Sequence, residues 1–191
     1  MEAAKIIEIE SDKHYIFKSE RLGFRDWKDT DLGKLAEINA DPEVMKFFPA
    51  TQSREQTKIF IDRMSLQFKE KGFCYFAVDR LDTLEFTGFI GLSVQTFEAD
   101  FNPCIDVGWR LKQSAWNKGF ATEGAKKCLD YAFNHLKLKK INAMAPKANL
   151  PSINVMKKLG MKEVRTFDHP LLLNDARLRE CILYETPGNL S

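Results

Sequence analysis

Apolar residues recur along this chain with two periods, one typical of helices and one typical of strands. Four stretches combine helical spacing with a polar face, and seven runs rich in β-branched and aromatic residues read as strands. The expected helices are 31–40, 53–72, 120–136 and 152–159. The expected strands are 16–25, 73–80, 86–96, 104–111, 140–145, 162–167 and 180–185.

Local boundary signals support these helices. Asp41-Pro42 stops the first helix, because proline cannot continue the helical hydrogen-bond pattern. The second helix opens with the capping-box pattern Ser53-x-x-Gln56 and ends at Gly72. A polar turn over residues 81–85 joins the second and third strands.

The order of elements predicts an α+β fold. Two helices are followed by three consecutive strands and then by alternating helices and strands, an order that favours a mixed sheet. We expect one domain over residues 16–187, preceded by a loosely held extension (1–15) and followed by a fraying tail (188–191).

Composition narrows the class of protein. The chain has 191 residues, of which 44% are hydrophobic and 29% charged, as in a globular domain. A net charge of +2 gives no general argument for nucleic acid or membrane binding. No apolar run is long enough to cross a bilayer, and the start of the chain lacks a signal-peptide core, so we expect a cytoplasmic protein. The four cysteines and three histidines are scattered, which favours reduced packing cysteines and no metal site.

The segment Trp116-Asn117-Lys118-Gly119-Phe120-Ala121-Thr122-Glu123 lies between an expected strand and an expected helix. A glycine turn at this point places free backbone N–H groups at the positive end of the helix, where a phosphate or pyrophosphate binds favourably. The alternative is a plain connection in which Gly119 only relieves a tight backbone.

Two motifs carry a family resemblance. Trp-x-Lys-Gly-Phe-Ala-Thr-Glu-x-Ala, from Trp116, resembles the acetyl-CoA pyrophosphate loop of the GNAT N-acetyltransferases, most closely that of the Rim-type ribosomal-protein N-terminal acetyltransferases. Asn149-x-x-Ser152-x-x-Val155-x-x-Lys158-Leu159-Gly160-Met161 is similar to a second signature of that branch. The resemblance extends from about Glu20 to Tyr184. It implies a central mixed, mostly antiparallel sheet flanked by about four helices.

The resemblance also implies acetyl-CoA as co-substrate. Its pyrophosphate would meet the backbone of the loop, with Lys118 adding charge unless it is simply a solvated lysine. The strand before the loop would bind the pantetheine arm and polarise the thioester carbonyl through backbone N–H groups near Trp109 and Arg110, and Gly108 suits a bulge or a close backbone approach there. The expected cofactor-binding residues are Trp109, Arg110, Leu111, Trp116, Asn117, Lys118, Gly119, Phe120, Ala121, Asn149 and Ser152.

For catalysis the resemblance implies an acidic general base, for which Asp106 is the candidate, and an acid near the departing sulfur, for which Ser152 is the candidate. Asp106 read as a surface ion-pair partner is the alternative, and Asn149 is also a plausible helix cap. Tyr184 is a second candidate acid, although its strand position favours the core.

Three residues are expected on the acceptor side. Phe48 and Tyr75 would shape the acceptor wall, by analogy with the fold. His169, in the segment Phe167-Asp168-His169-Pro170, would line the pocket or, equally, satisfy backbone groups of its own turn.

The sequence therefore predicts an acetyl-CoA-dependent N-acetyltransferase that transfers directly to a primary amine, on a protein N-terminus or a small molecule, without a metal. We expect a monomer or homodimer. One alternative is an inactive module of the same fold that senses acyl-CoA. A nucleotide-binding domain of another class is disfavoured, because neither G-x-G-x-x-G nor a P-loop lysine motif is present.

Overall fold

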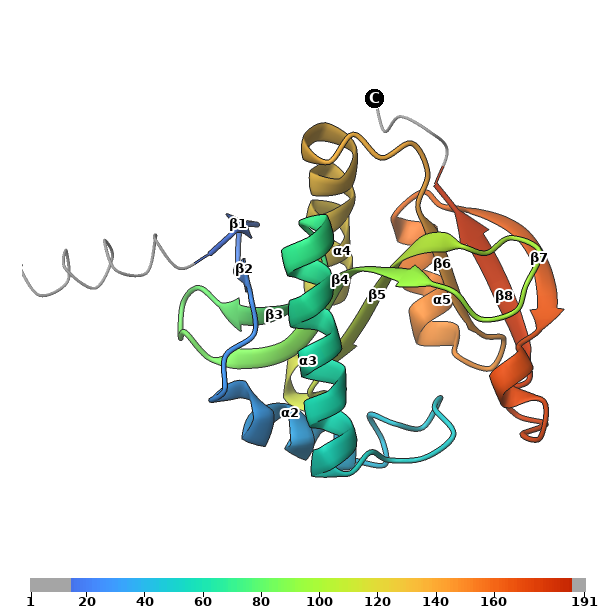
Figure 1. Cartoon of the computed structure of the whole chain (residues 1–191), viewed down its shortest axis with the longest axis horizontal. Coiled ribbons are helices and arrows are strands. Elements are labelled where there is room, and N and C mark those ends of the chain that lie inside the picture. The colour runs from blue at the N-terminus through green and yellow to red at the C-terminus, as the bar shows by residue number, and fades with distance from the viewer. Residues whose placement is uncertain (1–14, 187–191) are drawn as a thin grey trace, which may run out of the picture.

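One mixed sheet of eight strands, with helices against both faces, organises residues 15–186, the part of the chain that the computed structural model describes (Figure 1). The strand order is β1-β2-β3-β4-β5-β6-β8-β7. The strands are β1 (Phe17–Lys18), β2 (Leu22–Arg25), β3 (Tyr75–Arg80), β4 (Phe86–Gln95), β5 (Cys104–Leu111), β6 (Asn142–Pro146), β7 (Lys162–Asp168) and β8 (Glu180–Glu185). The helices are α2 (Asp31–Ala40), α3 (Arg54–Lys71), α4 (Phe120–Asp130) and α5 (Leu150–Lys158).

The expected α+β class, with a mostly antiparallel sheet and four main helices, is confirmed. Only β5 and β6 pair in parallel, and all other neighbouring strands are antiparallel. The expected N-terminal extension and C-terminal tail lie almost entirely outside the described residues.

The one expected strand over 16–25 was wrong. It is a hairpin of β1 and β2, in which Phe17 pairs with Phe24 and the N–H of Ser19 donates to the C=O of Leu22 at 2.9 Å. The turn contains neither glycine nor proline, so nothing in the local sequence marked it.

The helix ends that were predicted from neighbouring residues agree with the structure. The side chain of Ser53 accepts from the N–H of Gln56, and the side chain of Gln56 accepts from the N–H of Ser53, which completes the capping box of α3. Gly72 ends α3 with a φ of 75°, the left-handed conformation that favours glycine. The expected helix over 120–136 is α4 continued by a π-helical turn, η2 (Tyr131–His135).

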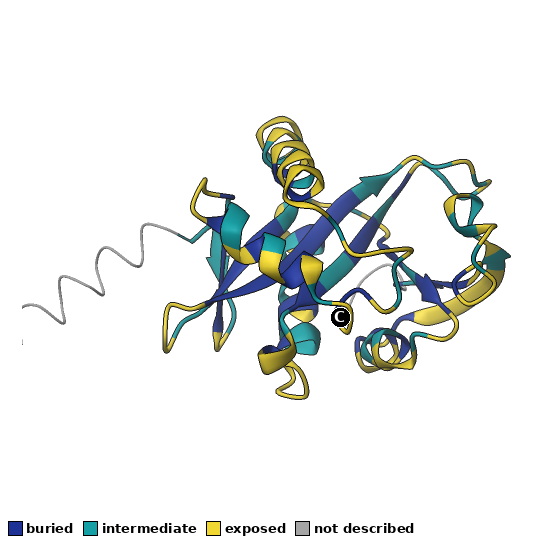
Figure 2. Ribbon diagram, turned by 90° about the horizontal axis from the view of Figure 1, so that it is seen from below, coloured by how far each residue is buried: buried dark blue, intermediate teal, exposed yellow. Residues whose placement is uncertain are grey.

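The helices form two outer layers. In Figure 1, α3 crosses in front of the sheet and α4 lies behind it, and Figure 2 shows buried strands running between them. On the α4 side, Gly124 lets the helix approach Ile90 so closely that a Cβ would lie 2.4 Å from its side chain. On the other side aromatic rings dominate, with Phe60, Tyr75 and Phe89 in contact with one another. The middle strands, β3 to β5, are thus packed on both faces.

A buried ion-pair cluster fixes α2 to this sheet. The guanidinium of Arg25 donates to the carboxylates of Asp31 and Asp79, at 2.6 Å to each. Hydrogen bonds to both carboxylates and their negative charges raise the pKa of Arg25 despite its burial. The four cysteines are buried and free. No helix within residues 15–186 is long and apolar enough to cross a membrane.

Candidate active site

Strands β5 and β6 separate soon after they meet, and this separation creates the candidate site. Their only paired residues are Asp106 and Asn142. Beyond Asp106, β5 continues to Leu111 against β4 alone. The C-terminal half of β5 therefore presents one edge without a strand partner, as was expected for the pantetheine arm.

The phase of the β4–β5 ladder decides which N–H groups face this open edge. The N–H of Lys112 donates to the C=O of Thr87, at 3.0 Å, toward β4. Because backbone groups alternate along a strand, the N–H of Arg110 also faces β4, whereas those of Trp109 and Leu111 face the open edge. The expected thioester contact through the N–H of Arg110 was therefore wrong, because that group is directed at β4. The indole Nε1–H of Trp116 donates to the C=O of Leu111 at 2.8 Å, which agrees with this phase.

A glycine turn follows at the N-terminus of α4, as expected. Gly119 precedes the helix with a φ of 80°, and no side chain caps the first turn. Asn117 also has a positive φ, 57°, and with Lys118 it is exposed. The first N–H groups of α4, which no earlier turn can satisfy, are thus available to an anion. Phe120 and Leu111 are buried, so only their backbone can contact a ligand there.

Asp106 lies in a buried hydrogen-bonded cluster. Its Oδ1 accepts from the hydroxyl of Tyr75 at 2.7 Å and from Nε2 of Gln95 at 3.0 Å. Burial raises the pKa of Asp106 to about 6, and the hydrogen bonds from Gln95 and Tyr75 limit the rise. Burial, together with the charge of Asp106, raises the pKa of Tyr75 well above its ordinary value. Because no cation pairs with Asp106 within residues 15–186, the surface ion-pair alternative finds no support.

Gly108 makes this cluster possible. A Cβ at Gly108 would lie 2.9 Å from the ring of Tyr75. The expected close approach is therefore that of a side chain rather than of a backbone, and the strand has no register shift there.

Asn149 and Ser152 lie at the start of α5, directly after β6. The side chain of Asn149 caps the helix by accepting from the N–H of Ser152 at 3.2 Å. The hydroxyl of Ser152 makes no hydrogen bond to another described residue, so it is available to a ligand. Tyr184 is buried in β8 and donates to Glu163 at 3.3 Å, which confirms its place in the core.

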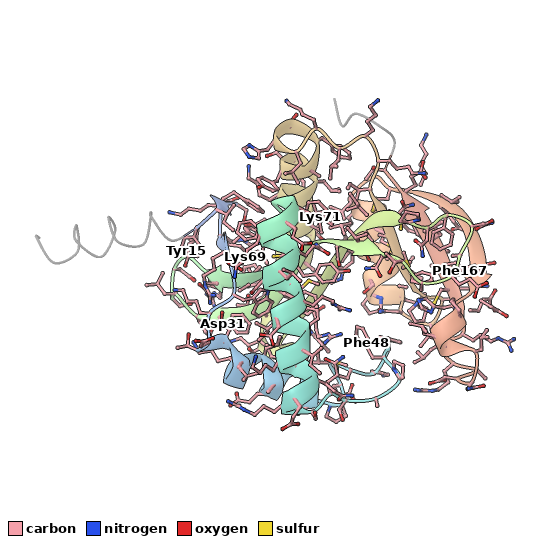
Figure 3. The ribbon with its side chains drawn as sticks, in the orientation of Figure 1. Tyr15, Asp31, Phe48, Lys69, Lys71 and Phe167 are labelled. Atoms are coloured by element: carbon pink, nitrogen blue, oxygen red, sulfur yellow. The ribbon has the colours of Figure 1, made fainter. Side chains whose placement is uncertain are left out.

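Two of the three expected acceptor-side residues are joined by one set of contacts, because Phe89 contacts both the guanidinium of Arg110 and the ring of Tyr75. Tyr75 contacts Asp106, and Phe48, on the loop between α2 and α3 in Figure 3, lies over the guanidinium of Arg110 at 4.2 Å. His169 instead packs on Phe97, with ring centroids 4.3 Å apart, and its Nδ1 accepts from the N–H of Leu171. This is the local-turn alternative, and burial lowers the pKa of His169.

Two residues of the site were not anticipated. Gln95 hydrogen-bonds both Asp106 and Tyr75, although it stands 11 and 20 residues from them in the sequence. Arg21 lies beside the glycine turn, where its guanidinium would be 3.4 Å from a Cβ at Gly119, and it pairs with Glu123 of α4. Only the strand register and the hairpin bring these residues to the site. Within residues 15–186, no group of three or more His, Cys, Asp or Glu side chains is arranged to hold a metal.

Comparison with known families agrees with this geometry. The family model described as Acetyltransferase (GNAT) domain matches residues 21–162. The chain belongs to the GNAT acetyltransferase family. The expectation of an N-acetyltransferase is confirmed at this level.

Among curated relatives, the uncharacterized protein YkkB of Bacillus subtilis is 27% identical over 163 residues, covering 83% of this chain and 94% of its own length. The uncharacterized N-acetyltransferase p20 of Bacillus licheniformis is 30% identical over 151 residues, covering 76% of this chain and 81% of its own. A GNAT acetyltransferase of Bacillus anthracis superposes with a TM-score of 0.74 at 26% identity, covering 89% of this chain and 96% of that one.

Two more distant structures share the fold. One is RimL, a ribosomal L7/L12 α-N-protein acetyltransferase in complex with coenzyme A, with a TM-score of 0.70 and 14% identity over 92% of this chain and 99% of its own. The other is spermidine N-acetyltransferase from Vibrio cholerae in complex with CoA and spermine, with a TM-score of 0.68 and 16% identity over 86% of this chain and 94% of its own.

Proposed function

We propose that this GNAT protein transfers an acetyl group from acetyl-CoA directly to a primary amine. The observation that carries the proposal is the position of Asp106. This buried carboxylate, with a pKa raised to about 6, lies where β5 and β6 begin to separate, on the strand that leads to the uncapped N-terminus of α4. A base with a pKa just below neutrality is ionised at pH 7 and can still accept a proton efficiently.

Each part of the site has one task in this proposal. The turn at Gly119 and the N–H groups that follow it hold the pyrophosphate of acetyl-CoA, with Lys118 nearby. The N–H groups of Trp109 and Leu111 bind the pantetheine arm and polarise the thioester carbonyl, since both face the open edge of β5. Acetyl-CoA supplies the activated acyl group. Asp106 removes the proton from the attacking amine, directly or through Tyr75.

The departing thiolate must be stabilised or protonated as the C–S bond breaks. Ser152 is suited to this task, because its hydroxyl is not engaged by another described residue and α5 begins directly beyond β6. Asn149 then combines two roles, as the cap of α5 and as a contact for the cofactor.

The pKa values of the possible acceptor amines favour an α-amine over a lysine side chain. An α-amine with a pKa near 7.7–8.0 is about one-tenth neutral at pH 7, whereas a lysine amine near 10.4 is neutral in about one molecule in 2,500. The difference, about 300-fold, corresponds to about 3.4 kcal/mol of activation free energy. A base with a pKa near 6 therefore suits an α-amine or another acceptor of low pKa, in keeping with the resemblance to Rim-type enzymes.

The test begins with acetyl-CoA binding by calorimetry, followed by release of CoA with a panel of primary amines. Gly119→Ala is compared with Gly72→Ala, because both positions have a positive φ, 80° and 75°, and neither gives a Cβ a backbone clash. We expect Gly119→Ala alone to weaken acetyl-CoA binding. Tight binding without transfer to any amine would favour the alternative of an acyl-CoA sensor, and absence of binding would refute the assignment of the loop.

A further inference from the structure

Two arginines are buried within residues 15–186, and only one of these two has a counter-charge there. Arg25 is paired with two carboxylates, those of Asp31 and Asp79. Arg110 is 8% exposed and forms no ion pair with any residue of the described part of the chain. Its surroundings therefore differ sharply from those of Arg25, although both side chains lie against the same middle strands.

Neutral groups hold Arg110. Its Nη1 donates to the amide Oδ1 of Asn39 at 2.7 Å and, weakly, to Oε1 of Gln52 at 3.4 Å. The rings of Phe48 and Phe89 lie over the guanidinium, at 4.2 and 5.3 Å from its central carbon. Its Nε is buried and has no hydrogen-bond partner.

Such a guanidinium is costly to the folded protein. Buried charges in proteins are normally paired, and a charge left without its partner destabilises the fold strongly. Amide oxygens and aromatic rings offset part of this cost but leave the positive charge uncompensated. Burial lowers the pKa of Arg110 to about 10, so the side chain is still charged at neutral pH. An anion beside Arg110 would supply both the missing counter-charge and an acceptor for its Nε–H.

Arg110 also lies where an acceptor would approach. Alternate residues of a strand share one face, which puts Arg110 on the same face of β5 as Asp106, with the ring of Tyr75 over Gly108 between them. Four residues of strand span about 13 Å, an upper limit for the separation of the two backbones. Phe48 and Gln52, which cover the guanidinium, are half-buried and belong to the loop between α2 and α3.

We propose that Arg110 recognises an anionic group of the acceptor, so that the preferred acceptor is a primary amine that also carries a carboxylate. The carboxylate binds the edge formed by the unused Nε–H and the adjacent Nη2, which makes no hydrogen bond to a described residue, while Nη1 keeps its bond to Asn39 and Phe48 moves aside. This inference rests on the proposed acetyltransferase function.

The experiment compares two acceptors that differ only in charge, the dipeptide amides Ala-Asp-NH2 and Ala-Asn-NH2, with acetyl-CoA as donor. A charge-assisted pair of this kind is worth about tenfold or more in kcat/KM. We expect the wild-type protein to prefer Ala-Asp-NH2 by that ratio, mainly through KM, and Arg110→Gln to reduce the ratio to near one. Arg63→Gln is the matched control, because Arg63 is an exposed arginine near Tyr75 that does not contact Arg110, and it should keep most of the preference.

A second variant tests the charge itself without depending on transfer. Asn39→Asp places a carboxylate at the position that now accepts from Arg110, but it also removes the hydrogen bond from Nδ2 of Asn39 to Thr57. The Tm effect of Asn39→Asp is therefore compared in the wild-type and Arg110→Gln backgrounds, and we expect it to be more favourable where Arg110 is present and to abolish the preference for Ala-Asp-NH2. A wild-type protein that acetylates both dipeptides equally, or a Tm effect of Asn39→Asp that is the same with and without Arg110, would overturn the inference. If no amine is acetylated at all, the proposed function fails, and the Tm comparison still reports on Arg110.

Discussion

Replacing Asp106 with asparagine removes the proposed base while keeping its shape. Oδ1 can still accept from Tyr75 and Gln95, as the carboxylate does at 2.7 and 3.0 Å. General-base catalysis typically contributes about 10²–10⁴-fold. We therefore expect Asp106→Asn to lower kcat/KM by about that factor at pH 7.5, with acetyl-CoA binding unchanged.

The pH profile is the sharper measure. For an α-amine acceptor with a pKa near 7.7–8.0, kcat/KM falls about tenfold per pH unit below pH 8, because only the free amine reacts. Below pH 6, Asp106 is protonated as well as the amine, and both must lose a proton before reaction. The slope of log(kcat/KM) against pH therefore increases from one to two. In Asp106→Asn the slope stays at one down to pH 5.

Tyr75→Phe tests the hydrogen bond that supports the base. The bond from Tyr75 favours the ionised carboxylate and thus holds the pKa of Asp106 down. A hydrogen bond to a charged group is worth about 1.5–3 kcal/mol, so its loss moves the second break in the profile upward by about one to two pH units. If Asp106 takes the proton directly, the variant is impaired at pH 6.5 and largely restored at pH 8.5; if the proton passes through Tyr75, the loss persists at pH 8.5.

Rates should be followed by chromatographic measurement of the CoA released, because this detection does not depend on the pH of the reaction. A wild-type slope of one down to pH 5, or an Asp106→Asn variant within fivefold of wild type at pH 7.5, would refute the role of Asp106. A break that does not move in Tyr75→Phe would separate the tyrosine from the base.

Three further predictions concern stability and the donor site. Because burial raises the pKa of Asp106 from 3.8 to about 6, the contribution of Asp106 to wild-type stability falls by up to about 3 kcal/mol as pH rises from about 4 to 6, and Asp106→Asn lacks this loss. Its Tm relative to wild type should thus increase over this range, and a constant difference would contradict the buried charge. Gly119→Ala and Gly72→Ala should each cost about 1–2 kcal/mol in urea unfolding, because alanine is strained at a positive φ. Ser152→Ala should lower kcat tenfold or more without changing Tm, whereas Asn149→Ala should cost about 1 kcal/mol by removing the cap of α5.

The sequence could predict features that depend on nearby residues. The capping box of α3, its glycine end and the turn before α4 each involve groups within a few positions of one another. Hydrophobic periodicity placed the middle strands for the same reason. The β1–β2 hairpin was missed because its turn, Ser19-Glu20-Arg21, has no glycine or proline to mark it.

The candidate site was only partly predictable, because its chemistry depends on strand register. Asp106 was recognised by resemblance, but its hydrogen bond to Tyr75 spans 31 residues and that to Gln95 spans 11. Nothing in the sequence of β5 shows that Arg110 is buried without a carboxylate or that its N–H faces β4. His169 was predicted on the acceptor side because of its side-chain chemistry, whereas in the structure it packs on Phe97 beside its own turn.

Two glycines paired across β4 and β5 fix the position of Tyr75 beside the proposed base. A Cβ at Gly91 would lie 2.1 Å from the backbone of Cys74, and a Cβ at Gly108 would strike the ring of Tyr75. The slot for Tyr75, and hence the setting of Asp106, is thus built into the rigid middle of the sheet. Part of the cover of Arg110 comes instead from the loop between α2 and α3, through Phe48 and Gln52, whereas Phe89 of β4 contacts both Arg110 and Tyr75. Changes in that loop can alter which amine is accepted and leave the hydrogen bonds to Asp106 in place, because those bonds come from Tyr75 of β3 and Gln95 of β4.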